Sequence, residues 1–269
     1  MEPAPDIYTH GYQEAVLRAH RWRTAANSAG YLLAHIGAGQ RLLDVGCGPG
    51  TLTCDLGRAV APGEVIGVDL SAAVVAEAAA HAAALSVANV SFVVGDFRSC
   101  GLDRQSFDVV HAHQVLQHLA DPVAALAAMA DLVRPGGLLA ARDSDYSALT
   151  WFPATEALDR WREVYLAVTG RNLVEADAGR WLLRWATLAG LSRLQYSTST
   201  WTFATPADRT WWASIWAARC VDSSFAEQAV AYGIATADEM ATLAEGWRAW
   251  AMEPEAVLVI LHGEILAWP

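Results

Sequence analysis

An apolar stretch that ends in three alternating glycines constrains this chain more than any other feature. Residues 41–45 are mostly apolar and read as a short buried strand, and Gly46, Gly48 and Gly50 follow at once. Glycine lets the chain turn sharply and leaves bare backbone against which a ligand can lie. The helix expected from Thr51 directs free N–H groups toward that turn. The stretch therefore predicts a strand–turn–helix unit that binds a small molecule.

The spacing of the glycines distinguishes this turn from two other nucleotide-binding loops. A dinucleotide fingerprint has the spacing G-x-G-x-x-G, and Thr51 stands where its third glycine belongs. A P-loop is excluded because no Gly-Lys-Ser/Thr sequence follows. Asp69 ends the next expected strand, 64–68, at a distance that suits a carboxylate binding ribose hydroxyls. The arrangement thus favours a ligand that carries a ribose.

Strands and helices alternate through the first half of the chain. Strands are expected at 41–45, 64–68, 90–94, 106–112 and 138–142, and helices at 51–60, 71–85 and 121–133, with a turn at 134–137. Thr51 and Ser71 are the expected N-caps of the first two of these helices. Such alternation predicts an α/β fold with parallel strands and right-handed crossovers, in which ligands bind at the carboxyl ends of the strands.

Five motifs in order make the chain resemble a known enzyme family. They are DVGCGPG (44–50), VDLS (68–71), GDF (95–97), FDVV (107–110) and LVRPGG (132–137). They resemble the motifs of class I S-adenosylmethionine-dependent methyltransferases, and most closely the branch of the ubiquinone and menaquinone biosynthesis enzymes (methyltransferase type 11). The resemblance implies S-adenosylmethionine as cofactor and methyl transfer as activity. It also implies a doubly wound, Rossmann-like, seven-stranded, mostly parallel sheet with an antiparallel last strand.

The resemblance also assigns cofactor contacts. The glycine turn would pass close to the amino-acid part of the cofactor. One acid would accept hydrogen bonds from the ribose hydroxyls, and the apolar residue after it would lie on the adenine face. A second acid would accept a hydrogen bond from the adenine amino group. In this sequence these residues are Gly46, Cys47, Gly48, Asp69, Leu70, Asp96 and Phe97. In many relatives an N-terminal helix closes over the cofactor, and residues 7–36 read as helical. Tyr12 would then reach the substrate, and Arg23 the methionine carboxylate.

Two histidines follow the fourth strand at the expected position of the methyl group. His113 lies where the chain leaves the sheet, and His118 lies five residues later. An imidazole that titrates near neutrality can accept the proton that a nucleophile loses. Alternatively, His113 contacts the cofactor through its backbone, and His118 caps loop groups. Amino-directed nucleic-acid methyltransferases carry Asn/Asp-Pro-Pro-Tyr/Phe here, and the absence of that signature argues against a DNA or RNA amine as substrate.

Substrate contacts are expected from residues beyond the fifth strand. Asp145 and Tyr146 follow that strand, and Trp151 and Trp212 belong to a segment rich in aromatic residues. The acids at 143 and 145 have the oxygen chemistry of a magnesium site, but the further ligands of catechol methyltransferases are not recognisable, so no metal is expected. The aromatic residues predict either a helical core or a pocket for an apolar, aromatic or isoprenoid substrate, or for one that develops positive charge.

The second half of the chain is expected to complete the sheet and to cover it. Helices are expected near 154–168 and 177–189, strands at 191–203 and 255–266, and a helical insertion of about fifty residues between those strands. We expect one domain with four kinds of segment. These are an N-terminal helical cap (1–36), a cofactor-binding core (37–142), substrate cap elements (143–190 and 204–254), and the last two strands (191–203 and 255–269).

Composition narrows the cellular context and the partners. The formal charge is −11 and all basic residues are arginine, without a basic stripe, which disfavours nucleic acid as a partner. No apolar run is long enough to span a bilayer, and the acidic segment 1–6, which is interrupted by prolines, is not expected to be a secretory signal. The four scattered cysteines are expected to be free thiols in a reducing cytoplasm. A homodimer is possible on this composition. Rival functions are a cyclase on the same fold and a non-catalytic cofactor-binding module, which the presence of Asp69 and Asp96 disfavours.

Overall fold

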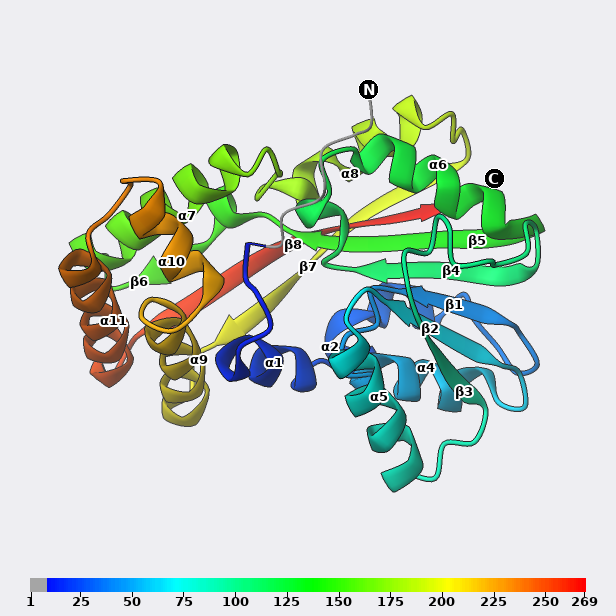
Figure 1. Ribbon diagram of the computed structural model, residues 1–269, viewed down its shortest axis with the longest axis horizontal. Helices are drawn as coiled ribbons and strands as arrows, with labels where there is room; N and C mark the ends of the chain where they lie inside the picture. Colours follow the sequence, from blue (N-terminus) through cyan, green and yellow to red (C-terminus); the bar gives the residue numbers. More distant parts are fainter. Residues whose placement is uncertain (1–8) are drawn as a thin grey trace.

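One mixed sheet of eight strands organises residues 9–269, the part of the chain that this computed structural model describes (Figure 1). The segment 1–6 and the first positions of the helix expected from residue 7 lie outside the described residues. In chain order the strands are β1 (Leu42–Val45), β2 (Val65–Asp69), β3 (Val90–Val94), β4 (Phe107–His113), β5 (Val133–Ser144), β6 (Thr150–Phe152), β7 (Leu194–Phe203) and β8 (Val257–Ala267).

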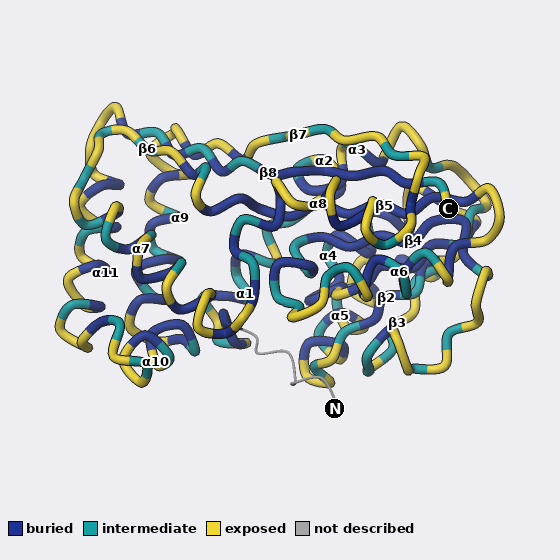
Figure 2. Tube along the Cα trace, turned by 90° about the horizontal axis from the view of Figure 1, so that it is seen from above, coloured by how far each residue is buried: buried dark blue, intermediate teal, exposed yellow. Residues whose placement is uncertain are grey.

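The sheet has the predicted doubly wound topology. Parallel strands run in the order β3-β2-β1-β4-β5, and β8 then pairs antiparallel with β5 along one edge and with β7 along the other. The short strand β6 was not expected; it pairs with β8 beyond the end of β5. The parallel strands β4 and most of β5 are buried along their length, as the dark tube in Figure 2 shows. Fold class and antiparallel last strand are therefore confirmed.

Alternate residues of the central strands face two separate helix layers. On one face, Leu43 and Val110 pack with α6 (Pro122–Leu132) and α8 (Ala178–Leu188). On the other face, Leu42 and Val109 pack with α4 (Thr51–Val60), while α5 (Ala72–Ala84) lies beside α4 against β2 and β3. This two-residue period is the one expected when both faces of a sheet are buried.

Three local expectations need correction. The N-cap of α4 is Gly50, in the left-handed region at φ +76°, and the Thr51 hydroxyl instead donates to the His20 carbonyl at 3.3 Å. The expected turn at 134–137 lies within β5 as an irregularity in its pairing with β4. The expected N-terminal helix is three short helices: α1 (Glu14–Arg21), α2 (Ala25–Ser28) and α3 (Gly30–Leu33). Thr24 breaks the run because it forms a reciprocal capping box with Asn27.

A helical cap covers the far ends of β7 and β8, at the left of Figure 1. It consists of α7 (Glu156–Arg171), α9 (Pro206–Arg219), α10 (Ser224–Ala231) and α11 (Ala237–Met252). Its interior holds stacked and edge-on indoles, among them the fully buried Trp161 and Trp247, whose ring centres lie 4.9 Å apart. Helix α8 falls in the segment expected to belong to the cap, but it packs on the sheet beside α6, because its apolar face meets β5 and β8.

Two further features concern membrane insertion and the state of the cysteines. Within residues 9–269, none of the helices combines the length and apolar character needed to cross a bilayer. The four cysteines are free thiols, and three of them are buried.

Candidate active site

The glycine turn after β1 holds a backbone path that other residues would obstruct. Gly46 has φ +66°, and a Cβ atom there would lie 2.5 Å from a methyl carbon of Val115. Gly50 has φ +76°, and a Cβ atom there would lie 2.8 Å from the Cβ of Ala78 on α5. The turn can therefore approach both the loop after β4 and the helix after β2 only because these positions lack side chains.

A buried polar group that the sequence did not reveal supports this turn. Asp44, beside His111 in the parallel register of β1 and β4, accepts at 2.8 Å from His111 Nδ1. Its other oxygen accepts from the Thr53 hydroxyl at 2.6 Å. All three side chains are buried. The arrangement joins β1, β4 and α4 directly beneath the turn, and only the strand order could have indicated that Asp44 and His111 meet.

A cavity opens at the carboxyl ends of β1 to β4, where the sequence placed the cofactor. Its walls bring together residues from the glycine turn, the ends of β2, β3 and β4, and the N-terminal segment. Residues expected at the site that line it are Tyr12, Arg23, Gly46, Cys47, Gly48, Asp69, Leu70, Asp96, Phe97, His113 and His118. Eleven residues spread over more than one hundred sequence positions thus converge on one cavity.

The two acids of the cavity are held in different ways. Asp69 accepts from the backbone N–H groups of Gly48 at 3.1 Å and Ser71 at 3.0 Å, and burial raises the pKa of its carboxyl. These bonds fix the carboxylate at the cavity wall and leave it lone pairs for further donors. Asp96 is paired with the guanidinium of Arg98, whose Nη2 lies 2.7 Å from Oδ2. Although burial alone raises it, the pKa of Asp96 is lowered on balance by the hydrogen bonds from Arg98.

Helix α1 forms the wall between the cavity and the cap. Arg18 donates to the hydroxyl of Ser214 on α9 at 2.6 Å. On the other side, Arg21 pairs with Glu77 of α5 at 2.5 Å. The helix is thus fastened to both the cap and the sheet layer. That position is the one expected of an N-terminal helix that closes over a ligand.

A smaller inner chamber adjoins this cavity on the side of the cap. The two share His20, Arg23, Gln114 and His118. Several aromatic residues of the chamber wall come from the loop after β5, from β7 and from α9. They include Tyr146, Trp201, Trp212 and Trp216, together with Arg219. Two of the four expected substrate residues, Tyr146 and Trp212, therefore line the inner chamber.

The other two expected substrate residues, Asp145 and Trp151, lie outside both the cavity and the chamber. Asp145 is buried and pairs with Arg180 of α8 at 2.5 Å, while its other contact caps a short 3-10 turn. Trp151 pairs with β8 within β6 and carries the guanidinium of Arg162 on its ring at 4.5 Å. Neither residue lines the cavity or the chamber, because the chain folds back onto β8 immediately after Ser144.

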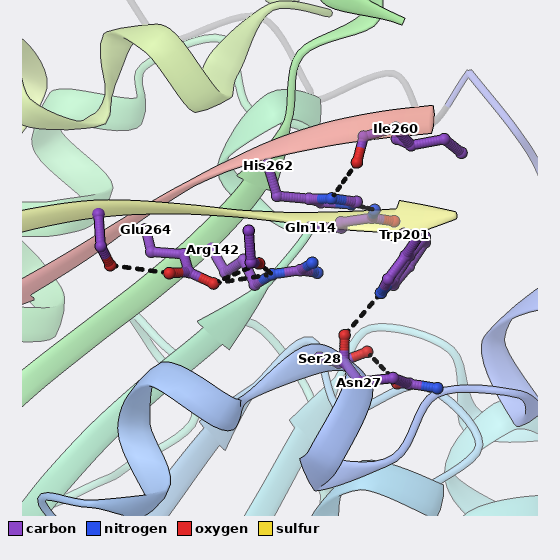
Figure 3. A network of polar contacts seen from close by, with 10 residues as sticks. Asn27, Ser28, Gln114, Arg142, Trp201, Ile260, His262 and Glu264 are labelled. Carbon is purple, nitrogen blue, oxygen red and sulfur yellow. Dashed lines mark hydrogen bonds and ion pairs between the residues drawn. The ribbon is translucent and has the colours of Figure 1, made fainter. Parts of the chain in front are cut away.

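A hydrogen-bonded chain orients Arg23, and Figure 3 shows its part from Ile260 through His262 to Gln114. His262 Nδ1 lies 3.2 Å from the Ile260 carbonyl and must carry the proton, so His262 Nε2 accepts from the Gln114 amide at 2.9 Å. This fixes the Gln114 carbonyl oxygen as the acceptor for Arg23. Gln114 has φ +53°, which side chains seldom adopt, so the fold constrains this residue. Gln114 and His262 were missed because nothing in the sequence pairs β8 with the loop after β4.

The expectation that the histidines titrate near neutrality is wrong. Burial, with smaller effects from Arg23 and Arg142, lowers the pKa of His113 well below its ordinary value. Burial, with Arg23 and Arg219, lowers the pKa of His118 to about 3. The Nε2 atom of His118 also lies 3.1 Å from the Gln117 amide nitrogen. Since Gln117 uses its oxygen to accept from Ser144, its NH₂ group occupies the His118 lone pair. Both imidazoles are neutral at pH 7, and His118 is already hydrogen-bonded at Nε2.

Carboxylates do not gather into a metal site in the described part of the chain. No cluster of three or more His, Cys, Asp or Glu side chains there has an arrangement that could hold an ion. Asp143 is fully buried and accepts from the backbone N–H of Gln117 at 3.2 Å. Burial raises the pKa of its carboxyl to about 7.

Comparison with known proteins identifies the family. A family model described as a methyltransferase domain matches residues 36–189. An uncharacterised methyltransferase of Schizosaccharomyces pombe is 30% identical over 96% of this chain and 95% of that protein. The chain belongs to the class I S-adenosylmethionine-dependent methyltransferases. It is an enzyme of that family, and its cofactor is S-adenosylmethionine.

Two other similarities are narrower. A ubiquinone biosynthesis O-methyltransferase of Albidiferax ferrireducens is 37% identical, over 37% of this chain and 39% of that enzyme. A solved phosphoethanolamine N-methyltransferase of Haemonchus contortus superposes with a TM-score of 0.58 at 17% identity. It covers 96% of this chain, which spans only 58% of that structure. The first similarity is confined to part of the methyltransferase domain, and the second shows the fold alone.

The methyltransferase's outer cavity suits this cofactor chemically. The cofactor supplies a methyl group on a positively charged sulfur. The wall contains bare backbone at Gly46 and Gly48 and the carboxylates of Asp69 and Asp96. Leu70 remains 62% exposed at the same wall, which leaves an apolar surface for a flat base. Acids and open backbone together match a cationic nucleoside.

Proposed function

We propose that this methyltransferase transfers the methyl group to a small, flat organic substrate held in the inner chamber. The observation that carries the proposal is that the chamber adjoins the cofactor cavity, with which it shares the lining residues His20, Arg23, Gln114 and His118. A substrate seated against the aromatic residues of the chamber would lie next to the donor, beside these four residues. Holding the two reactants in line, away from water, is the main requirement of such a transfer.

Individual roles follow from the contacts. Asp69 and Asp96 hold the ribose and the adenine amino group, with Leu70 and Phe97 around the base. Arg23, oriented by Gln114, binds the methionine carboxylate. Its partial burial and its position among the residues shared by the cavity and the chamber support this role.

His113, His118 and Tyr12 are proposed to have different roles in catalysis. His113 is buried at the cavity wall, and neither of its ring nitrogens has a hydrogen-bond partner among the described residues. A neutral imidazole in that state supports a role in accepting a substrate proton. His118, which lines both the cavity and the chamber, would instead position a ligand, since Gln117 hydrogen-bonds its Nε2. Tyr12 lines the cavity near Asp69 and supplies a hydroxyl to the bound molecules.

The helical insertion supplies the substrate walls. Trp212, Trp216 and Arg219 all come from α9, within the segment 204–254. This supports assigning that insertion as the substrate cap and the surrounding sheet as the cofactor-binding core. The metabolic context we propose is the modification of a natural product or quinone-like metabolite, because the chamber is aromatic.

Replacing Asp69 by alanine tests the cofactor site. We expect affinity for S-adenosylhomocysteine to fall by more than about tenfold, because two ribose hydroxyls lose a partly buried charged acceptor. Calorimetric titration of wild type and variant measures the change. Asp131→Ala is the matched control, since that exposed carboxylate on α6 pairs with Arg104 away from the cavity. Unchanged affinity in Asp69→Ala would refute the assignment, and absence of binding to wild type would refute the function.

A further inference from the structure

One long edge of the sheet has no partner strand within the described part of the chain. Strand β7 pairs with β8 on one side over all ten of its residues, and no strand of residues 9–269 pairs with its other side. In an antiparallel ladder every second residue directs its N–H and C=O groups away from the partner strand. None of the residues 194–200 is buried, and Figure 2 shows β7 along the margin of the molecule. Strand β7 therefore offers a row of backbone donors and acceptors to another chain.

This edge lacks the features that usually prevent strand edges from pairing. Natural edge strands are short or bulged, or they carry lysine, proline or other charged residues. Strand β7 reads LQYSTSTWTF, without a charged residue or a proline, and its register with β8 runs without a shift. The edge strand at the opposite end of the sheet, β3, is only five residues long. The short edge is thus protected by its length, and the long edge remains open to pairing.

The sheet surface beside this edge is uncharged as well. Trp201 of β7 and Ile260 of β8 pair with each other and belong to the apolar core of the cap. Because side chains alternate along a strand, their neighbours point to the face away from the cap. The side chains on that face of β6, β7 and β8 are exposed or half-buried, and none is charged. They include Phe152, Thr198, Thr200, Thr202, Val259 and Leu261.

The partner that fits this edge best is a second copy of the chain. A two-fold axis places the same strand of two copies side by side in antiparallel order, so β7 can pair with itself and the contact closes on two chains. Each chain has a formal charge of −11, so two copies repel each other over most of their surfaces. A contact between identical patches avoids that repulsion only where the patch is uncharged, as it is here.

We propose that two copies of the chain associate through antiparallel pairing of their β7 edges, which makes one continuous sheet across the dimer. The backbone of residues 194–200 supplies the hydrogen bonds, and the uncharged side chains beside the edge supply the surrounding contact. The same strand carries Trp201, which lines the inner chamber, so the pairing holds a strand that forms part of the chamber wall. The inference goes beyond the proposed methyl transfer and does not depend on it.

Sedimentation equilibrium of the wild-type protein over a dilution series tests the association. We expect an equilibrium between monomer and dimer without larger species, because two-fold pairing uses the β7 edge of both copies. Hydrogen exchange is expected to slow at residues 194–200 as the protein concentration rises, since their outward N–H groups become bonded. A protein that stays monomeric at about 100 µM, or that forms open chains of copies, would overturn the proposal.

A charged variant of each edge locates the contact. In the double variant Thr198→Lys, Thr200→Lys, we expect the dimer to dissociate at least about tenfold more readily, because like charges then meet across the two copies. Ser91→Lys is the matched control, since it adds lysine at an exposed position of the other edge strand, β3. Wild-type association in the folded double variant, or its loss in Ser91→Lys, would contradict the assignment of the edge. Circular dichroism checks folding, and if the double variant does not fold, hydrogen exchange of the wild-type protein still decides.

Discussion

Replacing Gly263 by alanine is expected to lower the free energy of unfolding by about 3 kcal/mol, because the added methyl group has no space. A Cβ atom at Gly263 would lie 2.0 Å from the carbonyl oxygen of Gly179. A Cβ atom at Gly179 would in turn lie 2.8 Å from the Asp143 carbonyl oxygen and the Gly263 nitrogen. The contact is backbone against backbone, so no side-chain rotation relieves it. Helix α8 would have to move away from β5 and β8.

Gly170→Ala on α7 provides a matched control for this substitution. A Cβ atom there meets nothing within 4 Å. Because alanine favours helix more than glycine does, we expect this variant to be unchanged or stabilised by up to about 1 kcal/mol. Urea denaturation of both variants and the wild type measures the difference. Two variants of equal stability would show that α8 does not rest on the backbone of β8.

The free energy of unfolding is expected to fall steeply as the pH drops below about 6.5, owing to five buried histidines. Burial is the largest cause that lowers the pKa of each, and the five are His10, His20, His113, His118 and His262. A histidine whose folded pKa is lowered stabilises the fold fully above its unfolded pKa. That contribution is lost as the pH falls toward the folded pKa, at about 1.4 kcal/mol per pH unit for each group.

Two acids act in the opposite direction, since burial raises the pKa of Asp69 as well as that of Asp143. The pKa of Asp143 is raised to about 7, so its contribution is complete below its unfolded pKa and is lost as the pH rises through 7. Five histidines against two carboxyls leave a net slope of about 4 kcal/mol per pH unit at most. Because domains are stable by about 5–15 kcal/mol, we expect acid unfolding with a midpoint between about pH 4 and 6.

Tryptophan fluorescence and circular dichroism across this pH range measure the transition. His118→Gln is expected to reduce the steepness by about one proton, because one titrating group is removed. His35→Gln is the control, since that imidazole is exposed on the surface. A stability that does not change between pH 7 and 5 would show that the chamber histidines are charged in the folded protein.

The sequence predicted the cofactor half of the molecule well because its determinants are local. The turn at Gly46, Gly48 and Gly50 and the acid at Asp69 follow their strands directly in the chain. Parallel strands bring their carboxyl ends to one edge, so knowing the strand order was enough to place Asp96 beside them. Ser71 caps its helix as predicted, whereas Thr51 does not, because the preceding glycine already takes the cap position.

The residues expected to contact the substrate were predicted less well, because only the pairing of β8 and the packing of the cap bring them together. Asp145 has the chemistry of a substrate ligand, but it pairs with Arg180, which lies 35 positions later and belongs to a helix packed on the sheet. Arg219 gave no signal in the sequence, since a helix-terminal arginine is usually solvated. Its burial results from the packing of α9 against α1 and β7.

What the sequence by itself determined is the strand–turn–helix unit and the doubly wound sheet, because both follow from short-range spacing and apolar periodicity. The cofactor and the family followed from the resemblance that the five motifs carry. Only the tertiary structure decided that Gln114 and His262 orient Arg23, and that burial lowers the pKa of the histidines. These properties depend on desolvation and on contacts between residues more than one hundred positions apart. Burial and long-range contact are created by the packing of the whole chain, and no local pattern encodes them.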